Sequence, residues 1–344
     1  MGVNLRTLVS KTKVDFKSLS GKSVAIDAYN ALYQFLAIIR QPDGTPLKDY
    51  SGRITSHLSG LFYRTANLVE MGVKVAYVFD GVPPALKEAE IKRRAKVKAE
   101  ALVKYEQAVR EGKMEKARSY AQMTSKLKDY MPEDSKRLLT ELGVPWIQAP
   151  SEGESQAAYM TTKGDADYCG SQDYDSLLFG ATALVRNVTV SGRRKVPRKR
   201  VYVEVVPEVM KLEQVLKELE ITREQLIDVA MLVGTDFNPD GVKGVGPKTA
   251  LKLIKKHGSI EDVLPRLEDV EFNADPNEIR KIFLHPKVTD NYQLEWKAPN
   301  VDGVIDFLCR ERDFSEDRVR KALARMSAGI KESKSKTTLE SWFG

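Results

Sequence analysis

The chain of 344 residues contains little cysteine and little histidine. Its two cysteines, Cys169 and Cys309, lie far apart and lack the spacing of a metal site or a disulfide framework, which is typical of a reducing, intracellular compartment. The three histidines are scattered along the chain, which argues against a histidine-rich metal site or a histidine-based catalytic triad. Any metal chemistry is therefore expected to use oxygen ligands, which favours Mg²⁺ or Mn²⁺ over Zn²⁺.

Long hydrophobic segments are also lacking. No apolar run approaches the ~20 residues that a membrane span needs, and the first residues have no signal-peptide core. A hydrophobic content of 42% supports a packed core, either one large α/β domain or two smaller ones. The net charge of +7 favours a polyanionic partner, although an ordinary surface of mixed charge is an equally good reading of composition alone.

Two short apolar segments predict buried parallel strands, and each ends in an aspartate. They span residues 23–27 and 73–80 and end at Asp27 and Asp80. The carboxyl ends of parallel strands form the ligand crevice of an open α/β sheet, so the two acids are expected to share a crevice. Either aspartate alone is more typical of a helix cap or a turn.

Four further carboxylates form two close pairs. Glu152-x-Glu154 opens a predicted helix, where Ser151 and Glu154 could instead form a capping box. Asp173-x-Asp175 follows a predicted strand, and on an extended chain such residues project to the same side about 6.5–7 Å apart. A cation between them would relieve their repulsion. The alternative is a hydrated acidic turn.

Together these acids predict a metal site at one edge of the sheet. Seven carboxylates cannot share a crevice without bound cations. Two divalent ions held there would suit the hydrolysis of a phosphodiester bond. The seven are Asp27, Asp80, Glu152, Glu154, Asp173, Asp175 and Asp236.

Basic elements surround this predicted edge. Residues 86–130 are rich in charge and in helix formers but have no wide apolar face, which predicts a projecting helical element or, alternatively, a solvated helical hairpin. Residues 190–200 predict a basic hairpin. The turn from Gly244 to Thr249, flanked by Lys243, is typical of a helix–hairpin–helix, whose glycines and free N–H groups approach a phosphate.

The order of these motifs resembles the flap structure-specific 5′ nucleases, most closely the archaeal-type flap endonucleases of the XPG-like superfamily. The resemblance covers nearly the whole chain and rests on several sequence blocks. They are MGVNLRTLV, IDAYNALYQFL, RITSHLSGLFYRT, YVFDGVPPALK, APSEGESQAAYM, SQDYDSLLFG, LVGTDFNPDGVKGVGPKTA and TLESWF.

The resemblance implies roles for individual residues. The seven carboxylates would hold two Mg²⁺ ions, with Mn²⁺ as a substitute, and Lys87 and Arg94 would stabilise charge at the scissile phosphate. Tyr33 would stack near the cut nucleotide. The DNA-contacting residues would be Gly2, Arg64, Lys243, Gly244, Gly246, Lys248 and Thr249, with a K⁺ ion at the helix–hairpin–helix turn.

The C-terminal peptide resembles one that docks on a sliding clamp. Leu339, Trp342 and Phe343 would supply the apolar plug. Lys336 stands where the family's peptide begins with Gln. The alternative is a flexible tail with incidental aromatic residues.

The expected architecture is an α/β, PIN-like 5′-nuclease fold with a central, mostly parallel sheet flanked by helices. The nuclease domain would be formed by residues 1–85 and 132–220, with a helical arch inserted at 86–131. Residues 221–330 would bind duplex DNA through a helix–two-turn–helix region, and residues 331–344 would be a flexible tail.

The function implied is that of a Mg²⁺-dependent DNA endonuclease and 5′–3′ exonuclease. It would cut a 5′ flap near a single-strand/duplex junction, in Okazaki fragment maturation and base excision repair. We expect an intracellular monomer from an archaeal-type cell. The alternatives are a repair nuclease with another junction preference, a catalytically silent clamp-associated DNA-binding scaffold, and a metal-dependent phosphomonoesterase.

Overall fold

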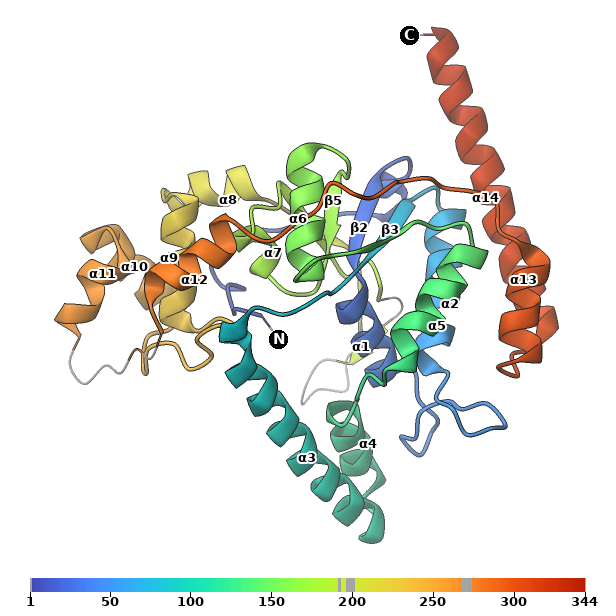
Figure 1. Ribbon diagram of the computed structural model, residues 1–344, viewed down its shortest axis with the longest axis horizontal. Coiled ribbons are helices and arrows are strands. Elements are labelled where there is room, and N and C mark those ends of the chain that lie inside the picture. Colours follow the sequence, from blue (N-terminus) through green and yellow to red (C-terminus); the bar gives the residue numbers. More distant parts are fainter. Residues whose placement is uncertain (1, 191–192, 196–201, 268–271, 273, 344) are drawn as a thin grey trace.

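The protein is built around a seven-stranded sheet (Figure 1). The computed structural model describes the chain except residues 1, 191–192, 196–201, 268–271, 273 and 344, and except the side chains of residues 193–195, 202–203 and 333–343. The strand order is β1-β9-β6-β5-β2-β3-β4. The strands are β1 (Thr12–Lys13), β2 (Ser23–Asp27), β3 (Lys74–Phe79), β4 (Trp146–Gln148), β5 (Tyr168–Gly170), β6 (Ala183–Arg186) and β9 (Glu208–Lys211).

The central strands β6, β5, β2, β3 and β4 run parallel, and β9 pairs antiparallel with both β6 and β1. This arrangement confirms the predicted α/β fold. It also brings the carboxyl ends of β2, β3, β4 and β5 to one edge of the sheet.

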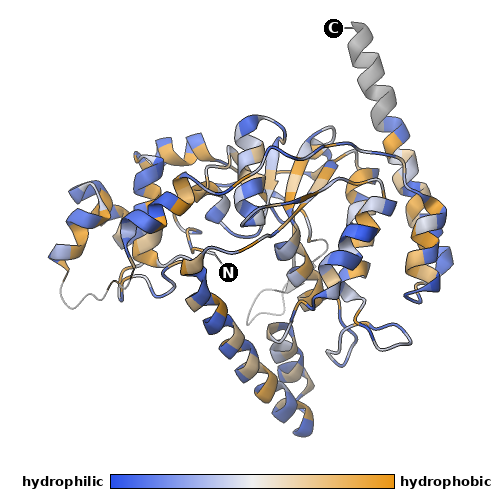
Figure 2. Ribbon diagram, viewed as in Figure 1, coloured by the Kyte–Doolittle hydropathy of each residue, from blue (hydrophilic) through white to orange (hydrophobic). Residues whose placement is uncertain are grey.

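Helices cover both faces of the sheet, and alternate strand residues enter two separate cores. On β3, Ala76 and Val78 pack on one side with α6 (Gly153–Lys163) and α9 (Arg223–Val233). Val75, Tyr77 and Phe79 pack on the other side with α1 (Ala28–Ile38), α2 (Ser56–Glu70) and α5 (Tyr130–Glu141). Burial on both faces explains why these strands read as continuous apolar runs (Figure 2).

A helical arch projects from this body. It consists of α3 (Glu88–Arg110) and α4 (Met114–Met123), which pack against each other (Figure 1). In α3 only Glu90, Ala101 and Ala108 are buried, so the helix is stabilised by its partner helix and by exposed i,i+4 ion pairs such as Lys92–Glu88. The predicted projecting helical element is therefore present.

A second group of helices lies beyond the sheet. It contains α8 (Leu212–Leu219), α9, α10 (Pro247–His257), α11 (Ile260–Val263) and α12 (Pro276–Leu284). A capping box of Thr222 and Gln225 begins α9. Gly246 is the N-cap of α10 and Pro247 its first residue, which is the tolerated place for proline in a helix.

The chain then returns across the body. Residues 286–300 run without helix or strand and are held by side chains, for example Trp296 Nε1, which donates to Val75 O at 2.7 Å. They lead to α13 (Val301–Ile305) and α14 (Glu316–Phe343). Helix α14 packs on α2, and the approach is so close that a Cβ on Gly329 would lie 2.5 Å from Glu70 Cα.

Two local predictions are wrong. Asp175 begins a short helix, α7 (Asp175–Leu178), because Tyr174 already has helical backbone angles, so Asp173 and Asp175 are not on an extended chain. Ser151 and Glu154 form no capping box, since Ser151 Oγ donates to Val82 O at 3.0 Å.

The predicted basic hairpin is present as β7 (Arg193–Lys195) and β8 (Tyr202–Glu204), which pair antiparallel. Its basic side chains lie outside the described part of the structure. The same holds for the side chains of the predicted clamp-binding residues Lys336, Leu339, Trp342 and Phe343. None of the helices in the described residues has both the length and the hydropathy that crossing a membrane requires.

His57 is a buried histidine that should make the protein sensitive to acid. Its side chain is fully buried, its ring nitrogens have no hydrogen-bond partner, and burial, followed by Arg312 and Arg53, lowers its pKa to about 3. The unfolded chain would bind a proton near pH 6.5, so the folded state loses about 1.4 kcal/mol per pH unit below that value. We expect His57→Leu to flatten this loss in urea unfolding between pH 6.5 and 4.5. Substituting the exposed His285 with Gln should not.

Candidate active site

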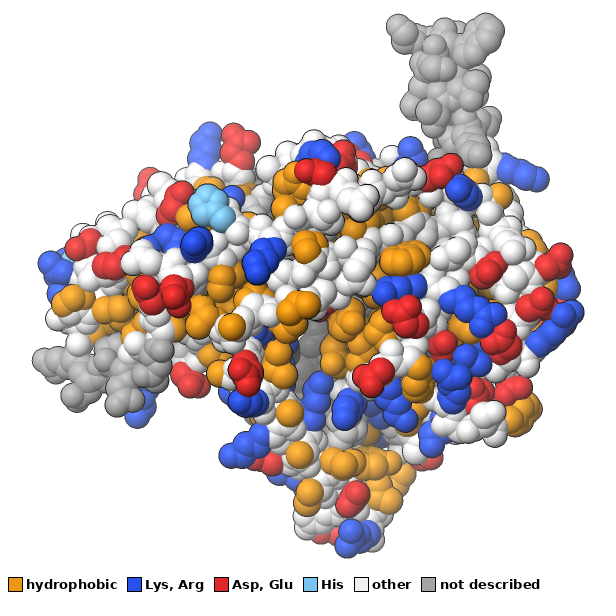
Figure 3. Space-filling view, in the orientation of Figure 1, with side chains coloured by type: hydrophobic (Ala, Val, Ile, Leu, Met, Phe, Trp, Pro, Cys, Tyr) orange, Lys and Arg blue, Asp and Glu red, His pale blue; other side chains and the backbone are white. Residues whose placement is uncertain are grey.

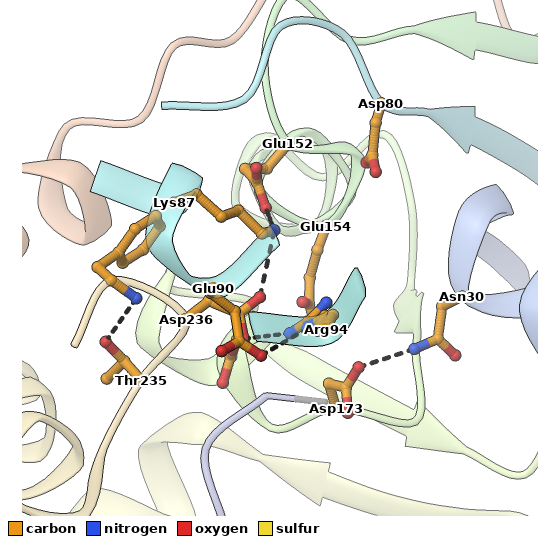
Figure 4. Close-up of polar contacts among 12 residues, drawn as sticks. Asn30, Asp80, Lys87, Glu90, Arg94, Glu152, Glu154, Asp173, Thr235 and Asp236 are labelled. Atoms are coloured by element: carbon orange, nitrogen blue, oxygen red, sulfur yellow. Dashed lines mark hydrogen bonds and ion pairs between the residues drawn. The ribbon is translucent and has the colours of Figure 1, made fainter. Parts of the chain in front are cut away.

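The seven predicted carboxylates lie at the carboxyl edge of the sheet, and Figure 4 labels Asp80, Glu152, Glu154, Asp173 and Asp236 among them. Asp27 ends β2, and Asp80 follows β3. Glu152 is the N-cap of α6 after β4, and Glu154 lies in the first turn of α6. Asp173 and Asp175 come after β5, and Asp236 follows α9. Four of them, Asp27, Glu152, Asp175 and Asp236, are at most 9% exposed.

Asp27 is both a helix cap and a member of this cluster. Its Oδ1 accepts the backbone N–H of Asn30 at 2.9 Å and so caps α1. Asp27 therefore serves both as a helix cap and as a residue of the cluster, although the sequence presented these two roles as alternatives.

Asp80 is held by the start of helix α6. Its Oδ1 accepts the backbone N–H of Gly153 at 2.6 Å. A Cβ on Gly153 would lie 2.8 Å from both that oxygen and Val78 O, so only glycine permits this approach. The glycine between Glu152 and Glu154 thus allows the N-terminus of α6 to lie against β3.

The N-terminus of the chain reaches the same cluster. Val3 N donates to Asp175 Oδ1 at 2.7 Å. Gly2 lies so close to this carboxylate that an added Cβ would be 2.6 Å from it. Glu154 Oε1 in turn accepts from the backbone N–H and hydroxyl of Ser176 at 3.1 and 2.5 Å. Gly2 therefore lies at the cluster, as the resemblance implies.

Burial and mutual repulsion raise the pKa values of four carboxyl groups of the cluster. Burial is the largest cause in every case. It raises the pKa of Asp80 to about 6, with Glu152 adding to the effect, and the pKa of Asp175 to about 7, with Asp236 and Asp173 adding to it. The pKa values of Asp27 and Glu154 are also raised, again by burial and then by neighbouring acids.

Two cations from the base of the arch enter the cluster (Figure 4). Lys87 Nζ contacts Glu152 Oε2 and lies 3.2 Å from Asp236 Oδ2. Burial would lower the pKa of Lys87, but the carboxylates of Glu152 and Asp236 outweigh it and raise the pKa. Arg94 Nη2 lies 2.5 Å from Asp236 Oδ1. Both predicted cations are thus brought to the carboxylates.

Glu90 orients Arg94 and was missed in the sequence. Its carboxylate is 2% exposed and accepts from Arg94 Nε and Arg93 Nε, both at 2.6 Å. A carboxylate four residues before Arg94 on a helix is a signal that could have been used. Asn30 was missed as well. Its amide Nδ2 donates to Asp173 Oδ2 at 2.8 Å.

Tyr33 lies at the gap between α1 and the arch. Its ring is 36% exposed, and Lys98 Nζ of α3 lies 4.5 Å from the ring centroid. Figure 3 shows a hollow between the arch and the body with Lys and Arg side chains gathered along its rim. The position is open enough for an aromatic contact with a ligand.

Arg64 lies in the interior, which does not favour the predicted contact with DNA. It is 7% exposed, and its guanidinium donates to Val188 O at 2.7 Å and Val190 O at 2.6 Å. These bonds hold the irregular segment after β6, which leads toward the β7–β8 hairpin.

The other predicted DNA-contacting residues form a separate surface. All five are exposed: Lys243, Gly244 and Gly246 lie in the turn before α10, and Lys248 and Thr249 lie in the first turn of α10. Gly244 has φ +81°, which a residue with a side chain rarely adopts. The turn is therefore a second candidate surface, built by different helices from those that hold the carboxylates.

The donor set fits divalent cations. All seven groups are carboxylates, the hard oxygen ligands of Mg²⁺ and Mn²⁺, and Lys87 already bridges two of them as a cation. Among the described side chains, no three are grouped tightly enough to hold one ion as they lie. Binding of an ion would therefore require these side chains to adjust.

The sheet, the arch and the carboxylate cluster define a PIN-like nuclease of the XPG type. Models of the XPG N-terminal domain and the XPG I-region match residues 1–101 and 143–236. Flap endonuclease 1 of Ignicoccus hospitalis is 58% identical over 351 residues, covering 100% of this chain and 99% of the relative. Flap endonuclease 1 of Staphylothermus marinus is 54% identical over 349 residues, covering 100% of both chains.

A solved structure agrees with these relatives. Flap endonuclease-1 from Methanococcus jannaschii matches with a TM-score of 0.75 and 44% identity, covering 96% of this chain and 99% of that one. The chain belongs to the flap endonuclease 1 family. It is accordingly a nuclease, and metal-dependent phosphodiester hydrolysis is general in this family.

Mg²⁺ binding should become stronger as the pH rises. Asp80 and Asp175 have pKa values of about 6 and 7 in the folded protein, above the value of about 3.9 of an unfolded aspartate. Their contribution to stability is complete below pH 3.9 and is lost as pH rises through 6 to 7. Mg²⁺ binds the deprotonated forms. We expect the rise in Tm caused by Mg²⁺, relative to EDTA, to increase from pH 5.5 to 7.5. An equal rise at every pH would contradict this linkage.

Proposed function

We propose that the protein cuts the 5′ strand of branched DNA at the junction between single strand and duplex. The proposal rests chiefly on one observation, the contact of Lys87 and Arg94 at the base of the arch with the buried carboxylate cluster. A strand entering between the arch and α1 would meet Tyr33, these two cations and the carboxylates together. The name shared by the relatives, flap endonuclease, supports the same substrate class.

The metal complement that we propose is two Mg²⁺ ions, replaceable by Mn²⁺. The seven carboxylates, Asp27, Asp80, Glu152, Glu154, Asp173, Asp175 and Asp236, would hold them directly or through water. When bound, the ions supply an activated water and neutralise the charge of the phosphodiester. Lys87 and Arg94 would bind the scissile phosphate and stabilise its developing negative charge, and Tyr33 would orient the neighbouring base by stacking.

The duplex would be gripped by the turn before α10. Its exposed backbone N–H groups and lysines contact phosphates and carry no sequence information, so binding should be nearly sequence-blind and sensitive to salt. We propose a K⁺ ion at this turn. In this scheme residues 1–85 and 132–220 form the nuclease domain, residues 86–131 the arch and residues 221–330 the duplex-binding region.

In the cell, this activity would serve Okazaki fragment maturation and base excision repair. The enzyme would work as an intracellular monomer, cutting flaps and also degrading from a 5′ end. Residues 331–344 would carry the clamp-binding peptide, with Leu339, Trp342 and Phe343 as its apolar anchors and Lys336 at its first position.

Cleavage of a set of labelled DNAs tests the proposal. At fixed Mg²⁺, a 5′-flap duplex should be cut near its junction faster than a nicked duplex, and single-stranded DNA of the same sequence should be cut least. The products should carry a 5′-phosphate and a 3′-hydroxyl. Equal cleavage of all three DNAs would contradict a structure-specific enzyme, and hydrolysis of phosphomonoesters alone would favour a different α/β hydrolase.

Deletion of residues 337–344 tests the proposed clamp contact. The apolar anchors of the peptide would be lost while the carboxylate cluster is untouched. We expect basal cleavage of the flap substrate to stay at the level of the full chain and stimulation by an added sliding clamp to disappear. Stimulation that survives the deletion would place the contact elsewhere.

A further inference from the structure

Asn30 contacts two of the seven carboxylates from a position on α1. Its backbone N–H donates to Asp27 Oδ1 at 2.9 Å. Its side-chain Nδ2 donates to Asp173 Oδ2 at 2.8 Å (Figure 4). Asp27 ends β2 and Asp173 follows β5, the strand that pairs with β2. One residue therefore links carboxylates delivered by two neighbouring strands.

The orientation of the Asn30 amide is fixed by a second contact. The backbone N–H of Gln172 donates to Asn30 Oδ1 at 3.3 Å. With the amide oxygen engaged by an N–H donor, the amide NH₂ must face Asp173. The backbone of Asp173 is also held, because Asp173 N donates to Ser171 Oγ at 3.1 Å.

The chemistry of an amide suits a group that orients a carboxylate for a cation. An amide donates a hydrogen bond without carrying charge, so it holds the carboxylate and leaves its negative charge for a cation. Lys87 and Arg94, by contrast, approach Glu152 and Asp236 with a full positive charge. Among the described hydrogen bonds to the carboxylate of Asp173, the Asn30 amide is the one donor.

We propose that Asn30 is a positioning residue that holds the Asp173 carboxylate in place for a divalent cation and so sets the Mg²⁺ requirement of the enzyme. This inference rests on the proposed metal site. Loss of a group that orients a metal ligand typically costs about 10–100-fold in metal affinity. The effect should appear in metal binding and not in the maximal rate, since Asn30 acts through the carboxylate of Asp173.

The test compares Asn30→Leu, which removes the donor at similar size, with Asn30→Ser, which keeps a hydroxyl donor. Gln34→Leu is the matched control, because it removes a hydrogen bond one turn further along α1, which Gln34 Oε1 accepts from Thr189 Oγ1 at 2.5 Å, without touching a carboxylate. Two quantities are measured for each protein. They are the affinity for Mn²⁺ without DNA, by calorimetry, and the Mg²⁺ concentration for half-maximal cleavage of a flap substrate.

For Asn30→Leu we expect the Mn²⁺ affinity to fall, and the Mg²⁺ concentration for half-maximal cleavage to rise, by about 10-fold or more. The cleavage rate at saturating Mg²⁺ should stay within about 3-fold of that of the unaltered chain. Asn30→Ser should lie between the two, and Gln34→Leu should match the unaltered chain. An unchanged Mn²⁺ affinity in both Asn30 variants, or a lowered rate that excess Mg²⁺ does not restore, would overturn the inference. If the unaltered chain itself binds no Mn²⁺, the proposed metal site fails instead.

Discussion

Asp175→Ala should abolish cleavage while leaving DNA binding intact. We expect the rate on a labelled 5′-flap duplex in Mg²⁺ to fall on the order of 10³-fold. Asp175 is 4% exposed and lies against Asp173 and Asp236 at the centre of the cluster, with its pKa raised to about 7. A group held in this environment favours a bound cation, and alanine removes one negative charge from the site. Binding should survive because the duplex-binding turn belongs to other helices.

The controls separate chemistry from folding. Asp175 also accepts the Val3 N–H, so Asp175→Asn should keep the N-terminus in place and still lose cleavage. Asp167→Asn is the matched substitution near the start of β5, where Asp167 bonds Ser23 and Lys22 at the surface, and it should cleave normally. Binding is measured in Ca²⁺ or EDTA. Full cleavage by Asp175→Ala would refute the assignment of the cluster.

The gathering of the carboxylates could be predicted because parallel strands deliver their carboxyl ends to one edge. Asp27 and Asp80 follow neighbouring strands, and the two further acidic pairs follow β4 and β5. The sequence could not show how the backbone orients the two residues of each acidic pair toward the site. The short strand β5 ends at Gly170, and the backbone turns into α7 before Asp175, so the expected extended spacing does not apply.

The placement of the Arg64 side chain could not be predicted from the sequence. The resemblance implies that Arg64 contacts DNA, as an exposed arginine would. It nevertheless lies three residues after Leu61 and four before Leu68, both buried in α2, and this helical spacing placed it on the core face. Its burial depends on the Val188 and Val190 carbonyls, which come from a segment more than 120 residues later. Such long-range polar partners cannot be read from local periodicity.

Lys87→Ala should lower the cleavage rate on the order of 10²-fold with little change in DNA affinity. Lys87 comes just before α3, and its ammonium bridges Glu152 and Asp236. Before the substrate binds, the carboxylates of Glu152 and Asp236 balance the positive charge of Lys87. When a phosphodiester enters, the lysine can turn to the phosphate oxygens, whose negative charge grows in the transition state, so the loss should appear in kcat more than in KM.

Lys92→Ala is the matched control for this prediction. Lys92 lies on the same arch helix, is paired with Glu88 and is 75% exposed, so its removal changes the net charge by the same amount without reaching the cluster. Single-turnover cleavage at saturating enzyme measures the chemical step for both variants. If both substitutions slowed cleavage equally, Lys87 would act through the general attraction of the arch for DNA. A selective loss in Lys87→Ala, not restored by excess substrate, would place its charge at the reacting phosphate.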